Sequence, residues 1–113
     1  MKDWEDAVAF ALSLAGTELS TSYGKPAVKV NGKAFMYVGR EPGSFAVSCP
    51  LPDKELLIDT DPGTFWETDH YRGWPAVLVR YGSLDRERIE IVITRAWWDR
   101  LKQGQRGAAG DRP

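Results

Sequence analysis

The dipeptide Asn31-Gly32 restricts the fold of this chain more than any other feature of its sequence. A two-residue hairpin turn of type I′ needs a positive φ angle at both central positions, and Asn-Gly is the pair that tolerates this best. Residues 27–30 before the pair alternate, with Val28 and Val30 on one side and Lys29 on the other, and the short apolar stretch at 34–38 after it is the expected return strand. The sequence therefore predicts an antiparallel hairpin over these residues.

Further strand signals surround this hairpin. A Pro-Gly turn at 41–44 separates it from a short apolar stretch at 45–48, which predicts a third strand. Residues 17–22 are rich in Ser and Thr, and the Gly and Pro within 23–26 indicate a turn or the edge of a strand. Residues 76–81 predict one more strand, with Val77, Val79 and Tyr81 on one face and Leu78 and Arg80 on the other. The middle of the chain is thus expected to be an antiparallel meander of three strands.

Three segments show the apolar spacing of helices. They cover approximately residues 4–15, 53–59 and 85–102. Asp3 can cap the first helix, whose first turn is acidic, as the helix dipole prefers. Pro52 suits the start of the second, where Leu56 and Leu57 are expected to face inward. The last helix has a broad apolar face, because Ile91 and Trp98 extend its main stripe.

The order of these elements defines the fold class. An N-terminal helix, the meander, a short helix, an irregular loop at 65–75, a strand and a final helix predict an α+β fold, with an antiparallel sheet flanked by N- and C-terminal helices. A length of 113 residues allows one domain, expected over 1–103. Residues 104–113 lack apolar periodicity and are expected to be disordered.

Composition excludes several classes of protein. A formal net charge of −1 does not by itself identify a class of binding partner. The single Cys49 cannot form an internal disulfide. No stretch reaches the roughly 18–20 apolar residues of a membrane span. The first residues are acidic and polar, unlike a secretory signal. We therefore expect a cytoplasmic protein that does not interact with membranes.

Charge is nevertheless uneven along the chain. Residues 19–40 contain Lys25, Lys29, Lys33 and Arg40 and no acidic residue, and aromatic residues lie between these cations. This pattern is typical of a surface for an anionic partner. It is also what the solvent face of a strand requires, and lysine on an edge strand prevents unwanted pairing.

Several short motifs resemble the MmcQ/YjbR family. They are Ser22-Tyr23-Gly24-Lys25-Pro26-Ala27, the Lys29–Lys33 hairpin, Cys49-Pro50 before an acidic helix, and His70-Tyr71-Arg72-Gly73-Trp74-Pro75 followed by Val77-Leu78-Val79. The similarity runs from about Trp4 to Leu101. It implies a CyaY-like α+β domain, also described as a double-wing fold, and a DNA-binding role that rests on analogy between folds.

Two hypotheses about binding follow. In the first, a basic sheet and hairpin surface binds DNA, with cations on the phosphates and tyrosines on bases or sugars; its residues are Lys25, Lys29, Lys33, Arg40, Arg72, Arg80, Tyr23, Tyr37 and Tyr71. In the second, an aromatic pocket binds a small anionic metabolite or peptide with Arg72 as anchor; its residues are Tyr23, Trp66, His70, Tyr71, Arg72 and Trp74.

The remaining signals are weaker. An interaction module is a third interpretation, in which the chain is a monomer or a weak homodimer through Ile91 and Trp98 of the last helix. His70 is the only histidine and, with Cys49, shows no spacing known from metal sites. The two could form a thiol nucleophile with its base, but no oxyanion donor or third catalytic group accompanies them. We expect no enzyme, no catalytic residue, no metal and no cofactor.

Overall fold

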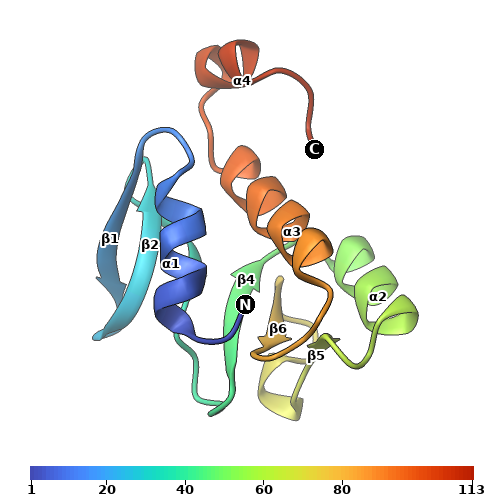
Figure 1. The fold of residues 1–113 in the computed structure, drawn as a ribbon. Coiled ribbons are helices and arrows are strands. Elements are labelled where there is room, and N and C mark those ends of the chain that lie inside the picture. The colour runs from blue at the N-terminus through green and yellow to red at the C-terminus, as the bar shows by residue number, and fades with distance from the viewer.

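The computed structural model describes residues 1–113 and is built on one sheet of six antiparallel strands. The elements are α1 (Trp4–Leu12), β1 (Thr17–Ser22), β2 (Lys25–Val30), β3 (Lys33–Tyr37), β4 (Ser44–Ser48), α2 (Leu51–Thr60), β5 (Phe65–Trp66), η1 (Asp69–Tyr71), β6 (Ala76–Arg80), α3 (Arg86–Asp99) and α4 (Gln103–Ala109). The strands lie in the order β1-β2-β3-β4-β6-β5, and Figure 1 shows β1 and β2 toward one side of the molecule and β5 and β6 toward the other. The α+β class with helices at both ends is confirmed.

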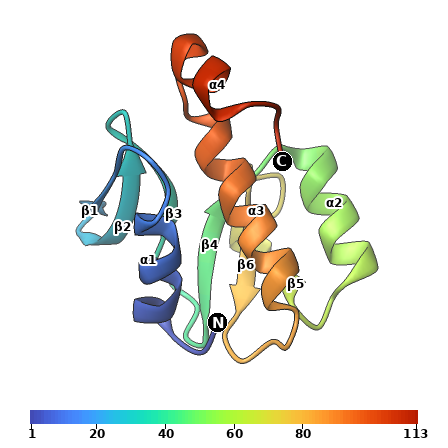
Figure 2. The ribbon, with the colours of Figure 1, turned by 45° about the horizontal axis from the view of Figure 1, so that its top comes forward.

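Three helices cover one face of this sheet, which we call the helix face. Helix α1 contacts β1 and β2, α3 contacts β3 and β4, and α2 contacts β5 and β6. The helices stand side by side in front of the strands (Figure 2). The opposite face, which we call the open face, carries no α-helix, and the loop that contains η1 packs against part of it. No helix of the structure combines the length and the apolar character that crossing a bilayer requires.

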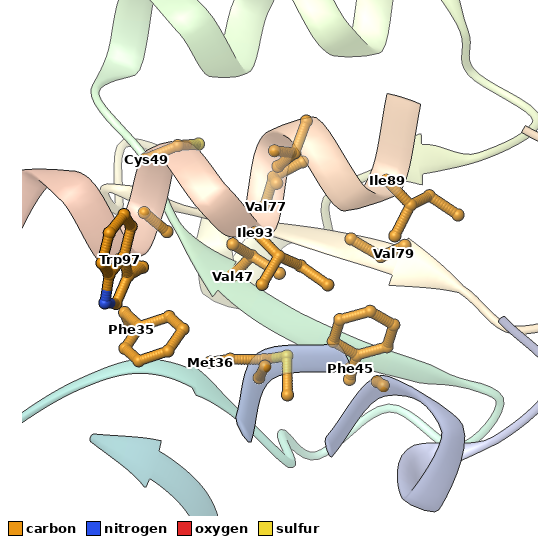
Figure 3. Close-up of a cluster of buried hydrophobic side chains, with 14 of the residues drawn as sticks. Phe35, Met36, Phe45, Val47, Cys49, Val77, Val79, Ile89, Ile93 and Trp97 are labelled. Carbon is orange, nitrogen blue, oxygen red and sulfur yellow. The ribbon is translucent and has the colours of Figure 1, made fainter. Parts of the chain in front are cut away.

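The large apolar side chains gather on the helix face. Phe45 and Val47 of β4 and Val79 of β6 meet Ile89 and Ile93 of α3 in this core, and all five are completely buried (Figure 3). The alternation of a strand turns the residues between them to the open face. This core holds the helix layer to the sheet, so the strands present a rigid floor on their other side.

The first helix begins as its sequence predicts and ends earlier. The backbone N–H of Asp6 donates to the Asp3 carboxylate at 2.8 Å, so Asp3 is the cap. The helix ends at Leu12 rather than near residue 15, because Gly16 adopts a positive φ of 73° and leads into β1. Trp97 of α3 then donates its indole N–H to the carbonyl of Ala15 at 2.8 Å, which joins α3 to the segment between α1 and β1.

The meander contains four strands, where the sequence indicated three. Residues 17–22 pair with β2 along their whole length. A second two-residue turn, Tyr23-Gly24, joins the pair, with φ angles of 52° and 78° that resemble the 55° and 76° of Asn31-Gly32. The sequence did not identify β1 as a strand because its Ser and Thr residues are common in turns as well, and its turn lacks the Asn-Gly signature.

Helix α2 differs from its prediction in the side chains that it buries. Leu57 is buried as expected, but Leu56 is 60% exposed, which corrects the inward placement predicted for it. Lys54 takes the inward position and is only 2% exposed. Residues 54 and 57 are three apart and share a helix face, whereas residue 56 lies on another side. Hydrophobicity alone therefore ranked the positions of this helix incorrectly.

The C-terminal residues also differ from the expectation of disorder. Helix α4 covers Gln103–Ala109, and the chain then returns toward α2 and α3 (Figure 2). Arg112 pairs there with Asp53 and Asp99, each at 2.8 Å. Arg106 stacks over the ring of Trp98 at 4.3 Å. The apolar extension of α3 around Trp98 is thus covered by the chain's own C-terminal segment.

Candidate ligand-binding site

The open face carries a hollow of about 520 Å³ over the ends of β3, β4 and β6. Three small residues, Ala34, Ser48 and Ala76, line it, one from each strand. Side chains this small leave space above the sheet, whereas Val or Phe at the same positions would fill that space. Tyr37 and the loop of residues 67–75 rise beside this floor, and the depression is what remains between them. We call this depression the hollow.

The loop beside the hollow is held from behind by the buried Lys54. Its ammonium donates to the carbonyl oxygens of Tyr71 at 2.6 Å and Trp74 at 2.9 Å, and it pairs with the carboxylate of Glu67 at 2.8 Å. All three N–H donors of the ammonium therefore have acceptors, which is the condition for keeping such a charge buried. Lys54 is a positioning residue for this loop that the sequence analysis missed, although its spacing from Leu57 indicates the inward face.

Tyr71 occupies the center of the loop and is 5% exposed. Its ring packs with Ala46, Ala76 and Leu78 in a small second cluster on the open face. Gly39 lies directly against its hydroxyl, and a Cβ at that position would overlap the oxygen. The chain between β3 and β4 therefore approaches the loop as closely as only glycine allows.

Three cations line the hollow: Lys25, Arg40 and Arg100. No carboxylate is among the lining residues. Lys25 donates to the carbonyl of Gly39 at 3.2 Å, and the Nε of Arg100 is buried without a hydrogen-bond partner. Arg100 follows α3 directly, where a cation also suits the helix dipole, so the sequence offered no separate signal for it.

Aromatic rings supply the apolar part of the lining. Tyr37 and Tyr71 are packed on the sheet, while Trp74 is 58% exposed and Tyr23 is completely exposed. His70 also lines the hollow, with its ring edge-on to that of Tyr71 at a centroid distance of 5.1 Å. Burial raises the pKa of Tyr37, and the neighboring Tyr71 adds to this effect, so its phenol is a neutral hydrogen-bonding group.

Three of the cations and aromatics expected at a site lie elsewhere. Arg72, expected to anchor a ligand, pairs with Asp69 at 2.7 Å and is not part of the lining, because the turn at Gly73 separates it from Trp74. Arg80 stacks over the ring of Trp66 at 4.2 Å, and both are outside the hollow. Each of these two arginines therefore has a partner within the protein, Asp69 for Arg72 and Trp66 for Arg80.

Two lysines of the expected DNA surface are also outside the hollow. Lys29 shares the open face of β2 with Lys25, but Glu18 of β1 lies directly opposite it in the ladder. Lys33 begins β3 beside the Asn31-Gly32 turn and is exposed. Of the residues predicted for either hypothesis, the structure brings together in the hollow Lys25, Arg40, Tyr23, Tyr37, Tyr71, His70 and Trp74.

Cys49 and His70 do not form a pair. Cys49 belongs to the core on the helix face, whereas His70 lines the hollow on the open face. Burial raises the pKa of the Cys49 thiol to about 12, so the reactive thiolate is scarce at neutral pH. No three side chains of His, Cys, Asp or Glu lie close enough to hold a metal ion. The chemistry of the hollow is therefore that of cations, hydroxyls and rings.

Fold and site together define a class: a small α+β protein with an antiparallel sheet covered by helices on one face and a cationic, aromatic hollow on the other. A family model described as YjbR matches residues 12–98, which is most of the chain. The chain belongs to the YjbR family, and the resemblance seen in its sequence is confirmed.

Three curated relatives match part of the chain. They are described as uncharacterized proteins, one from Mycobacterium bovis and two from strains of Mycobacterium tuberculosis. Each is 36% identical over 77 residues, which cover 65% of this chain and 60% of the relative. The match thus spans 60% of the length of these relatives.

Proposed function

We propose that this protein binds a compact anionic ligand in the hollow of its open face. The observation that carries the proposal concerns its nine arginines. Seven have a side-chain hydrogen bond, an ion pair or an aromatic ring as partner: Arg72, Arg80, Arg86, Arg88, Arg95, Arg106 and Arg112. The other two, Arg40 and Arg100, have none, and both line the hollow.

The surroundings of these two arginines support an anion as the missing partner. Lys25 adds a third positive charge, and the lining contains no carboxylate that could neutralize any of them. The Nε–H of Arg100 is buried without an acceptor, and a buried unsatisfied donor costs about 1–3 kcal/mol. A bound oxyanion in the hollow would accept hydrogen bonds from the free N–H groups at the ends of these guanidiniums and neutralize their charge.

The shape of the site supports a small ligand. A volume of about 520 Å³ is within the range of roughly 300–1,000 Å³ that small-molecule sites occupy. The wall is held in place before any ligand arrives, because Lys54 binds the backbone of the loop at both Tyr71 and Trp74. Preorganization of this kind lowers the entropic cost of binding.

Chemical unfolding with added pyrophosphate tests the proposal. Ionic strength is matched with NaCl, so that only specific binding stabilizes the protein. A ligand at 100 times its Kd adds about 2.7 kcal/mol to the free energy of unfolding. We expect this gain for the parent protein and for Arg95→Met, whose arginine is on α3 but outside the hollow. We expect little gain for Arg100→Met. An equal gain in all three proteins would reject the site.

DNA binding is the second candidate function, and one observation favors it. Lys25 and Lys29 alternate onto the open face of β2, and Lys25 lines the hollow together with the exposed Arg40. This gives a phosphate chain more than one cation to contact. The patch is narrow, because Glu18 is opposite Lys29 and Arg80 rests on Trp66. The geometry therefore supports a compact anion better than a long duplex.

Fluorescence anisotropy with a labeled duplex and the matching single strand separates the two candidates. Three phosphate contacts on a duplex predict a slope of about −2.7 in a plot of log K against log salt concentration. A slope of that size or steeper, reduced together with affinity in Lys29→Glu, would support DNA. If neither form of DNA binds at low salt, the small anionic ligand is the remaining candidate.

A further inference from the structure

Two kinds of group line the hollow: cations and exposed aromatic rings. A simple anion requires only the cations. These cations suit an oxyanion, but Trp74 and Tyr23 also expose large aromatic rings in the hollow, at 58% and complete exposure. Exposed rings of this size cost free energy in water, and they are typical of sites where a flat ligand stacks. The lining therefore indicates a ligand with two different parts.

Tyr23 is the less expected of the two rings, because its backbone is unfavorable for a tyrosine. It occupies the first central position of a two-residue hairpin turn at a φ of 52°, where Asn, Asp or Gly is preferred. The Asn31-Gly32 turn of the same sheet uses the preferred pair at nearly the same angles. Nothing covers the Tyr23 ring, so packing within the chain does not explain it. Strained residues of this kind are found at ligand clamps.

The cations supply the donor groups that a phosphate group requires. A guanidinium binds phosphate oxygens through two parallel N–H donors, and both Arg40 and Arg100 keep their donors free of protein acceptors. Lys25 contributes a compact charge that suits the remaining oxygen. The hydroxyls of Ser48 and Tyr37 supply neutral donors and acceptors in the same space.

From these two sets of groups we infer that the ligand of the hollow is a nucleotide, bound by its phosphate at Arg40 and Arg100 and by its base against Trp74 and Tyr23. This inference rests on the proposed anion site and names the class of its ligand. The base must be unstacked to reach an aromatic side chain in a hollow. A free mononucleotide and a nucleotide within a single strand share this chemistry, whereas a base paired in a duplex does not offer it.

Isothermal titration calorimetry with matched probes tests each part of the ligand. The probes are the four ribonucleoside 5′-monophosphates, the corresponding nucleosides, ribose 5-phosphate, and single-stranded homopolymers of five nucleotides. We expect at least one monophosphate to bind roughly tenfold more tightly than both its nucleoside and ribose 5-phosphate, because stacking and phosphate contacts each contribute.

Three variants and two controls assign the parts of the ligand to residues. Trp74→Ala should reduce the affinity for that monophosphate to about the level of ribose 5-phosphate. Arg100→Met should reduce it to about the level of the nucleoside, and the exposed Arg40→Gln repeats the test without a buried change. Arg72→Met, in the same loop but outside the lining, and Arg95→Met should bind as the parent does.

Each outcome decides between the inference and the proposal beneath it. Equal affinity for ribose 5-phosphate and every monophosphate, lost in Arg100→Met, would overturn the nucleotide and leave the anion site. Unchanged affinity in Trp74→Ala would overturn the stacking contact. If no probe binds and pyrophosphate does not stabilize the protein, both fail. Tighter binding of a homopolymer than of its monomer would identify the single strand as the source.

Discussion

The two faces of the sheet use the same strands for opposite purposes. On the helix face, Phe45 and Val47 of β4 are completely buried against α3. On the open face, the same strand presents Ala46 and Ser48, and the space above Ser48 remains empty. The alternation of a strand lets one segment hold a core on one side and form the floor of a site on the other.

The faces also differ in how their charges are satisfied. Around the helix layer, Asp6 pairs with Arg86 at 2.9 Å and Asp53 with Arg112 at 2.8 Å. In the hollow, Arg40 and Arg100 have no such partner. The comparison separates a helix face whose charges are paired within the protein from an open face where two arginines are not, and this difference is the basis of the proposed binding site. Substitutions on the first should change unfolding, and those on the second should change affinity.

The largest effect is expected from Phe45→Ala. The ring is completely buried, stacks on Tyr81 at 5.4 Å and meets Trp4 edge-on at 6.3 Å. Removing it leaves a cavity and should lower the free energy of unfolding by about 3–5 kcal/mol. Urea titration measures this loss. Leu84→Ala is the control, since Leu84 is fully exposed and should stay within about 0.5 kcal/mol of the parent. Similar losses in both variants would contradict the role of the helix-face core in the stability of the fold.

Lys54→Met should change both the free energy of unfolding and the affinity for a ligand. Lys54 belongs to α2 of the helix layer, and its ammonium binds the loop beside the hollow. The variant leaves the carbonyls of Tyr71 and Trp74 without their donor and separates Glu67 from its cation. Glu67 is partly exposed, so we expect a loss of about 2 kcal/mol rather than that of a fully buried pair. Amide exchange should rise in residues 67–75, and affinity for pyrophosphate should fall. The exposed Lys102→Met is the control. Parent-like exchange in the loop would remove the positioning role of Lys54.

Tyr23→Asn sharpens the comparison, because it should improve stability while it impairs the site. Asn tolerates the positive φ of 52° better than Tyr, which should raise the free energy of unfolding by about 1 kcal/mol. The stacking ring is lost, so affinity for the best monophosphate should decrease. Asn31→Tyr at the other turn is the reverse control and should destabilize, since Asn31 also donates to the carbonyl of Arg100 at 3.0 Å. A Tyr23→Asn protein with parent affinity would exclude Tyr23 from binding.

The smallest effect concerns the pH dependence of the helix layer. The hydrogen bond from Arg86 lowers the pKa of Asp6 from 3.8 to about 2. As pH falls from about 4 to about 2, the unfolded chain therefore binds a proton before the folded one, and stability is lost. Asp6→Asn should show a shallower decline of stability across this range in acid unfolding followed by fluorescence. Glu55→Gln, on an exposed side of α2, should decline as the parent does. Equal slopes for Asp6→Asn and the parent would exclude this contribution.

Local signals predicted the fold where a residue acts within its own segment. Asn31-Gly32 forms its turn, Asp3 caps α1, and the alternation around Val77 and Val79 puts both into the core. These features depend on φ angles, capping and period, all of which a short stretch of chain contains. Strand β1 was missed for the complementary reason. Its Ser and Thr residues favor no single structure, and only the ladder with β2 makes them a strand.

The site was predicted in part, because some of its members come from one loop. His70, Tyr71 and Trp74 stand close together in the sequence and remain together in the hollow. Arg72 belongs to the same loop, yet it pairs with Asp69 and does not line the hollow. The turn at Gly73 separates Arg72 from Trp74. Lys54 and Arg100 come from the ends of two helices, and no pattern in the sequence connects them to this loop.

The sequence by itself determined the α+β class, the Asn31-Gly32 hairpin, the cap of α1 and the aromatic, basic composition that suggested a binding surface. Only the tertiary structure decided which cations remain without a partner. That property depends on whether a carboxylate or a ring from a distant segment lies within a few ångströms, as Asp69 does for Arg72 and Trp66 for Arg80. Arg40 and Arg100 have no such neighbor because the small residues of three strands leave open space beside them.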